Sequence, residues 1–139
     1  MSSEEKRSWI YAVVGVGVSA VYFVTVLSKA QGADVATIAY VRPMLTAIGA
    51  AIVLSIVASI AAAIASPKEA DRTDERDRQI HRFGEYVGFY VMSVAAIVPL
   101  ALAMAEVAHF WIANALYLAF VLAALASSIA KIVAYRRGF

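Results

Sequence analysis

The sequence predicts an all-α protein with four transmembrane helices arranged as two hairpins. Of its 139 residues, 63% are hydrophobic and 16% are charged, whereas soluble domains are about half apolar and about a quarter charged. The apolar residues gather in four runs of about 20 residues or more, the helical length that crosses about 30 Å of bilayer hydrocarbon. Four such runs leave no room for a soluble domain, so we expect residues 1–139 to form one transmembrane domain.

The first two expected spans cover about residues 9–28 and 43–66. Trp9 lies at the start of the first span, where interfacial aromatic side chains are favoured. Pro43 suits the first turn of the second span, because the first helical residue needs no N–H donor. Pro67 ends that span, since proline disfavours α geometry in the residue before it.

The third and fourth expected spans cover about residues 84–106 and 110–134, joined by a very short turn. Pro99 predicts a kink in the third span. Gly84 and Gly88 are four residues apart and predict a site where a neighbouring helix packs closely. Further small residues suited to close packing are Gly15, Gly17, Ser19 and Ala20 in the first span, and Ala119, Ala123 and Ser127 in the fourth.

A charged connector, residues 67–83, separates the second and third spans and contains equal numbers of acids and bases. Thr73 is the expected helix N-cap, and the acids Asp74 and Glu75 after it suit the positive end of a helix dipole. From the end of the connector onward, apolar residues recur at helical spacing, so this helix is expected to continue into the third span. The predicted apolar stripe is Ile80, Phe83, Val87 and Tyr90.

Basic residues are distributed unevenly along the chain. All but two of the 12 lysines and arginines lie near the termini or in the connector; the exceptions are Lys29 and Arg42. Loops with an excess of basic residues stay in the cytoplasm. We therefore expect a multi-pass protein of the cell membrane, with both termini and the connector on the cytoplasmic side and the two hairpin turns outside.

Four polar residues in or near the spans are candidates for a membrane site: Glu85, Glu106, His109 and Asn114. Glu106 and His109 have a spacing that helical metal ligands use, but two groups are too few for a ligand set, which favours a plain polar turn. Glu85 either faces a water-filled cavity or pairs with a base such as His81. Asn114 either contacts a solute or hydrogen-bonds a neighbouring helix.

The sequence carries no signature of catalysis or of a bound cofactor. It contains no cysteine, which excludes disulfides, thiolate nucleophiles and cysteine metal sites. It also lacks a glycine-rich phosphate loop and a Ser/His/Asp arrangement. We expect no enzymatic activity, no cofactor and no metal. Because the basic residues flank apolar spans, membrane topology explains them better than direct nucleic-acid binding does.

The charged connector is the best candidate for a partner-binding site. A mere spacer needs only about three residues, as the turn between the last two spans shows. A helix that presents charges to the cytoplasm could dock a soluble protein, whereas the plainer alternative is a solvated loop that holds the hairpins apart. The candidate contact residues are Asp74, Glu75, Arg76, Asp77 and Arg78.

Several motifs resemble a family of small bacterial four-helix membrane proteins of uncharacterised function. Residues 74–80 read Asp-Glu-Arg-Asp-x-x-Ile, with Pro-Lys-Glu-Ala-Asp before them at 67–71 and Gly-Glu-Tyr-Val after them at 84–87. Residues 109–117 and the tail 135–137 are similar too, so the resemblance covers nearly the whole chain. Members are often encoded beside a small helix-turn-helix regulator. The resemblance thus implies a bacterial inner-membrane protein with such a cytoplasmic regulator as its partner.

Three functional classes fit these observations. The first is a membrane sensor or sequestering anchor whose connector binds a soluble partner, with regulation as its role. The second is a small transporter or channel subunit acting as a homo-oligomer; small four-helix exporters, however, use a carboxylate buried in the first span, and this first span has none. The third is a structural subunit of a larger membrane complex. We expect the first class.

Overall fold

The computed structural model describes residues 2–32, 34, 37–67 and 74–138, and these residues form helices joined by turns. No strand occurs among them, in agreement with the predicted all-α class. The helices are α1 (Ser3–Ala30), α2 (Val41–Ala65), α4 (Glu75–Ala95), α5 (Ile97–Met104) and α6 (His109–Arg137).

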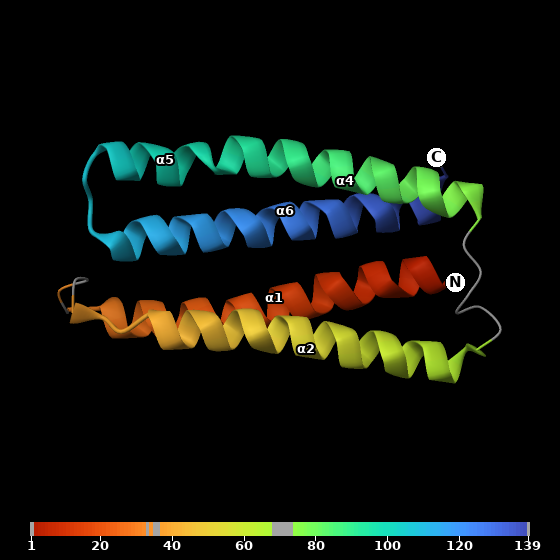
Figure 1. Ribbon diagram of the computed structural model, residues 1–139, viewed down its shortest axis with the longest axis horizontal. Helices are drawn as coiled ribbons and strands as arrows, with labels where there is room; N and C mark the ends of the chain where they lie inside the picture. Colours follow the sequence, from red (N-terminus) through yellow and green to blue (C-terminus); the bar gives the residue numbers. More distant parts are fainter. Residues whose placement is uncertain (1, 33, 35–36, 68–73, 139) are drawn as a thin grey trace.

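Four helical segments are long and apolar enough to cross a membrane: α1, α2, α4 with α5, and α6. Figure 1 shows them side by side as two hairpins, with both chain termini at one end. We call this the termini end, where Ser3, Ala65, Glu75 and Arg137 lie, and the opposite end the turn end. The prediction of four candidate membrane spans is thereby confirmed.

The helices contact one another in the order α2, α1, α6 and then α4 with α5. The contact between α4 and α6 is the most extensive, and α1 joins the two hairpins by packing on α6. Among the described residues, α2 makes an extensive contact with α1 alone. The centre of the structure is therefore the pair α1 and α6, with α2 at its edge.

Small residues bring α4 and α6 together, as the Gly84 and Gly88 spacing predicts. A Cβ added at Gly88 would lie 3.2 Å from the Cβ of Ser127 and 3.3 Å from the carbonyl oxygen of Ala123, and one at Gly84 would meet the aliphatic stem of Lys131. Such positions allow two helix backbones to approach closely.

The predicted continuation of the connector helix into the third span is confirmed, because α4 runs from Glu75 to Ala95. The predicted apolar stripe, however, is mostly not the face that packs on α6. The face turned toward α6 buries Asp77, Ile80, Gly84 and Gly88, whereas Tyr90 is 66% exposed. In a bilayer, the apolar side chains face lipid and the small ones face the neighbouring helix, because lipid tails are as apolar as the side chains themselves.

The helix is interrupted three residues before Pro99, where the sequence predicts a kink. Helix α4 ends at Ala95 and α5 begins at Ile97, with Ala96 between them. Proline has no N–H to donate to the carbonyl four residues earlier, and its ring crowds that carbonyl. The regular pattern resumes one residue later, where the N–H of Leu100 donates to the carbonyl of Ala96 at 3.2 Å.

The surface is far more apolar than that of a soluble protein, and the buried residues include polar as well as hydrophobic side chains. The buried polar or charged residues are Glu5, Ser8, Ser19, Asp77, Asn114 and Ser128, whereas large apolar residues stand exposed along every helix. Soluble monomers rarely expose contiguous apolar patches of more than a few hundred Å². A bilayer covers such a surface, so the structure fits a multi-pass membrane protein.

Candidate functional site

The candidate site lies at the termini end, where α4 begins. The N–H of Asp77 donates to Oδ1 of Asp74 at 2.8 Å, and the N–H of Asp74 donates to Oδ2 of Asp77 at 3.1 Å. This reciprocal capping box makes Asp74 the N-cap, one residue later than the predicted Thr73, which itself lies outside the described residues. Two carboxylates satisfy otherwise unpaired N–H groups and favour the positive end of the helix dipole.

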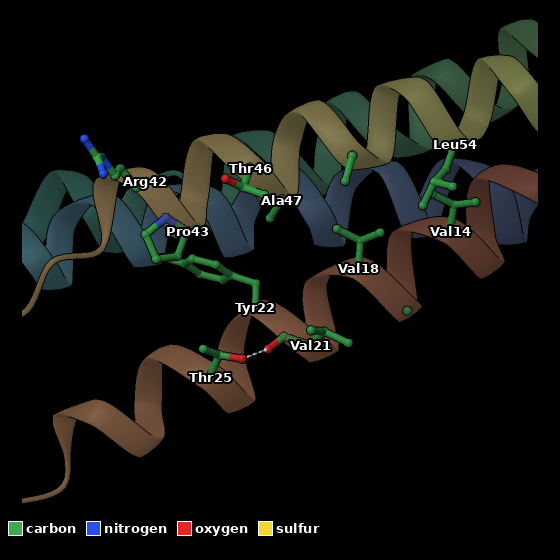
Figure 2. Close-up of a pocket in the computed structure, with 12 residues that line it drawn as sticks. Val14, Val18, Val21, Tyr22, Thr25, Arg42, Pro43, Thr46, Ala47 and Leu54 are labelled. Carbon is green, nitrogen blue, oxygen red and sulfur yellow. Dashed lines mark hydrogen bonds between the residues drawn. The ribbon is translucent and has the colours of Figure 1, made fainter.

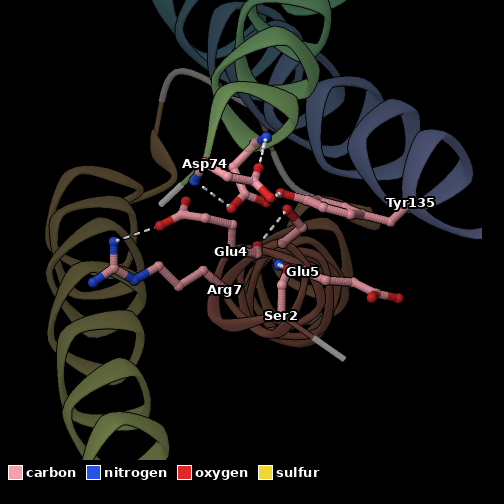
Figure 3. A network of polar contacts seen from close by, with 8 residues as sticks. Ser2, Glu4, Glu5, Arg7, Asp74 and Tyr135 are labelled. Carbon is pink, nitrogen blue, oxygen red and sulfur yellow. Dashed lines mark hydrogen bonds and ion pairs between the residues drawn. The ribbon is translucent and has the colours of Figure 1, made fainter. Parts of the chain in front are cut away.

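Asp77 also fastens α4 to the end of α6. It is 7% exposed, and the hydroxyl of Tyr135 donates to its Oδ1 at 2.6 Å. Arg76 strengthens the same junction, since its Nη2 donates to the carbonyl oxygen of Tyr135 at 3.3 Å and its guanidinium lies 5.7 Å from the ring centroid. Figure 3 shows Tyr135 meeting the start of α4 directly above α1.

The first turns of α1 complete this network of polar contacts. The buried carboxylate of Glu5 forms an ion pair with Arg136 at 2.8 Å, and its N–H donates to Oγ of Ser2, the N-cap of α1. Nζ of Lys6 donates to Oγ of Ser66 at 2.9 Å, which connects α1 to the end of α2. Segments from both ends of the sequence therefore hold the connector side of the structure together.

A cavity of about 120 Å³ lies between α1, α4 and α6 at this end. Its lining includes the acids Glu4 and Asp77 and the bases Arg7, His81 and Lys131. Because both signs of charge line it, this cavity has no preference for an anion or a cation on charge alone.

Glu75 and Arg78 face solvent, unlike Asp77. They form an ion pair at 3.5 Å with side chains 66% and 64% exposed, respectively. Surface pairs of this kind contribute little to stability. The five residues predicted to bind a partner thus divide: Asp74, Arg76 and Asp77 hold the helix start in place, and Glu75 and Arg78 remain open to contact.

Glu85 forms an ion pair with a residue that local spacing did not indicate. Its Oε1 accepts from Nζ of Lys131 on α6 at 2.9 Å, and Oγ of Ser127 lies 3.5 Å away. The expected partner was His81, one turn earlier on α4, whereas the structure pairs Glu85 with Lys131 of the neighbouring helix. Glu85 therefore lies at the α4–α6 interface.

Asn114 makes the interhelical hydrogen bond that was one of its two predicted roles. Its Oδ1 accepts from the hydroxyl of Tyr22 on α1 at 2.6 Å, and its Nδ2 donates to the carbonyl of Phe110 at 2.8 Å. The ring of Tyr117 lies edge-on to that of Tyr22 at 4.9 Å. Polar and aromatic contacts join α1 to α6 inside the span.

Glu106 and His109 lie apart from the candidate site, at the turn end, and both are exposed. Glu106 has a φ of 56°, and α5 ends in a Schellman motif: the N–H of Glu106 donates to Ala103 and that of Val107 to Leu102. In the described part of the chain, no three His, Asp or Glu side chains gather as metal ligands.

Sequence reasoning missed Glu5, Tyr135 and Arg136 as parts of the site. The polar Tyr-Arg-Arg tail was visible, but its partners are separated from it by most of the chain. No family model, curated protein or solved structure matches the chain. The fold, with four helices long and apolar enough to span a membrane, fits the class of multi-pass helical membrane proteins, and the family resemblance stays a prediction.

Proposed function

We propose that this protein is a membrane sensor or anchor whose termini end lies in the cytoplasm and binds a soluble protein, such as a helix-turn-helix regulator. The observation that carries the proposal is the exposed charged face at the start of α4, supported from behind by its contacts to α6. The excess of basic residues at this end supports its cytoplasmic orientation.

Helix α4 presents this face without a break between solvent and membrane. Its inner side buries Asp77, Ile80 and Gly84, while Glu75, Arg78, Gln79 and Arg82 are exposed on the other sides. A surface already fixed in its bound conformation loses little entropy on binding. A shift of α4 within the membrane would also move this face directly.

The exposed residues alone form the proposed contact. Charge reversal at Arg76 or Asp77 would disturb the junction with Tyr135, so loss of binding there would not separate contact from folding. The discriminating variant is Glu75→Lys combined with Arg78→Glu, because this double reversal preserves an ion pair of the same spacing. Its matched control is Arg137→Glu, an exposed charge at the same end on α6.

The test is a mild-detergent pull-down of the tagged protein from its native cells, analysed by mass spectrometry. We expect the unmodified protein and Arg137→Glu to recover the same soluble partner, and the double reversal to lose it. Equal recovery by all three proteins would contradict the assigned contact. Recovery of no soluble protein by the unmodified chain would contradict the proposed function.

A further inference from the structure

A groove of about 770 Å³ runs between α1 and α2, a volume typical of ligand sites. Figure 2 shows its walls, with Val14 and Val18 from α1 facing Ala47 and Leu54 from α2. The groove exists because glycine and alanine at the contact leave space that larger side chains would fill. It is almost entirely apolar.

Most polar groups of this groove are satisfied within the protein. The hydroxyl of Tyr22 donates to Asn114, and that of Thr25 donates to the carbonyl of Val21 at 2.8 Å. Arg42 differs: it is exposed at the turn end of the groove, and its side chain has no ion pair or hydrogen bond among the described residues. Thr46, one turn further along α2, lines the same groove. Within the described part of the chain, an unpaired positive charge therefore lies at one end of the apolar groove.

The groove has the depth of one membrane leaflet. From Arg42 to Leu54, α2 rises about 18 Å at 1.5 Å per residue, and half of the bilayer hydrocarbon is about 15 Å. With the apolar lining in the hydrocarbon, the guanidinium of Arg42 lies at the level of the lipid headgroups.

The groove is long and apolar. Its volume of about 770 Å³ extends along about 18 Å of helix. An extended hydrocarbon chain fits such a groove, and the exposed guanidinium of Arg42 at its end complements an anionic headgroup.

We propose that this groove binds one anionic glycerophospholipid from the leaflet at the turn end. One acyl chain lies between α1 and α2, and the phosphate lies against Arg42. The planar guanidinium donates paired N–H groups to phosphate oxygens, a geometry in which arginine excels. The lipid covers the face that α1 and α2 leave open, and this site is independent of any soluble partner.

Two variants test the two parts of the site. Gly17 lines the groove, and no atom lies within 4 Å of an added Cβ there, so Gly17→Leu fills the groove without a clash. Its control is Gly49→Leu, equally free of contacts but outside the lining. Arg42→Gln removes the headgroup contact, with Lys29→Gln as the control for the other base near the turn end.

The experiment is native mass spectrometry of the purified full chain, titrated with phosphatidylglycerol or phosphatidylcholine. We expect the unmodified protein and both controls to prefer phosphatidylglycerol. Arg42→Gln should bind it about tenfold more weakly, the loss of one charge-assisted contact, and should weaken phosphatidylcholine less, because the choline cation already offsets the charge of that lipid's phosphate. Gly17→Leu should weaken both lipids.

Several results would overturn the proposal. These are equal affinity of the unmodified protein for the two lipids, unchanged phosphatidylglycerol binding in Arg42→Gln, and unchanged lipid binding in folded Gly17→Leu. A dimer that Gly17→Leu dissociates would assign the groove to a second copy instead. If Gly17→Leu fails to fold, Arg42→Gln decides, because Arg42 is exposed and its substitution leaves helix packing intact.

Discussion

Helices α2 and α6 are both long enough and apolar enough to cross a membrane, but they pack differently. Helix α2 contains the most hydrophobic of the four candidate spans, yet Ala47 is its single buried residue. Helix α6 packs on α1, α4 and α5 and buries residues as different as Phe110, Asn114 and Ser128. Hydropathy therefore locates a span in the membrane but does not state which helices that span contacts.

This difference has a physical cause. Lipid and leucine are equally apolar, so burying an aliphatic side chain against another helix gains little over leaving it in lipid. Close backbone approach and interhelical hydrogen bonds remain as the forces that hold spans together. Helix α6 has both, through Ser127 beside Gly88 and Asn114 beside Tyr22, and α2 has few.

The largest expected difference between α6 and α2 is the loss of stability when a large side chain is truncated. Phe110 is 2% exposed and Ile52 is 56% exposed. Phe110→Ala should lower the free energy of unfolding by about 3 kcal/mol, because it leaves a cavity in the core around Tyr22 and Tyr117. Ile52→Ala on α2 should change it by less than about 0.5 kcal/mol. Unfolding by denaturing detergent, followed by circular dichroism, measures both; comparable losses would contradict the peripheral position of α2.

The next largest effect is the loss of stability when a glycine at a close contact between two helices is replaced. Gly88→Leu should destabilise the protein by about 2 kcal/mol, because the new side chain meets Ser127 and the backbone of Ala123. Gly49→Leu on α2 should be neutral or stabilising, since leucine has the higher helix propensity and nothing lies within 4 Å of the new Cβ. The same unfolding assay applies, and a neutral Gly88→Leu would show that α4 and α6 do not pack closely there.

The smallest expected effect is the loss of the hydrogen bond between Tyr22 and Asn114. A double-mutant cycle of Tyr22→Phe and Asn114→Leu should give a coupling energy of about 0.6 kcal/mol, the usual value for such bonds in membranes. Thr25→Val serves as the control, since the Thr25 hydroxyl bonds only within α1. Zero coupling would mean that this hydrogen bond does not help to hold α1 against α6.

Sequence reasoning succeeded where a residue determines the structure of the segment that contains it. The four apolar runs, the break near Pro99 and the small residues Gly84 and Gly88 each have local physical causes, and the structure agrees with each prediction.

The same reasoning failed where the contact joins distant segments. Helical spacing suggested His81 as a partner for Glu85, but α6 supplies Lys131 at 2.9 Å. Likewise, Asp77 was expected to face solvent, and the hydroxyl of Tyr135 bonds it instead. Nothing local in one sequence states which helix lies beside α4, so these partners could not be derived.

The most direct test of the central claim, that α2 lies at the edge, uses the absence of cysteine from the chain. Single cysteines placed along α2 from Ile48 to Ile60, and along α6 from Asn114 to Lys131, would carry spin labels in liposomes, and dissolved oxygen would report lipid exposure. Our account predicts helical alternation of exposure along both helices, with one narrow, partly protected face along α2, which packs on α1, and a wider and more deeply protected surface along α6, which packs on α1, α4 and α5. A protected surface along α2 as wide and deep as that of α6 would contradict it, because a second surface would then cover that helix.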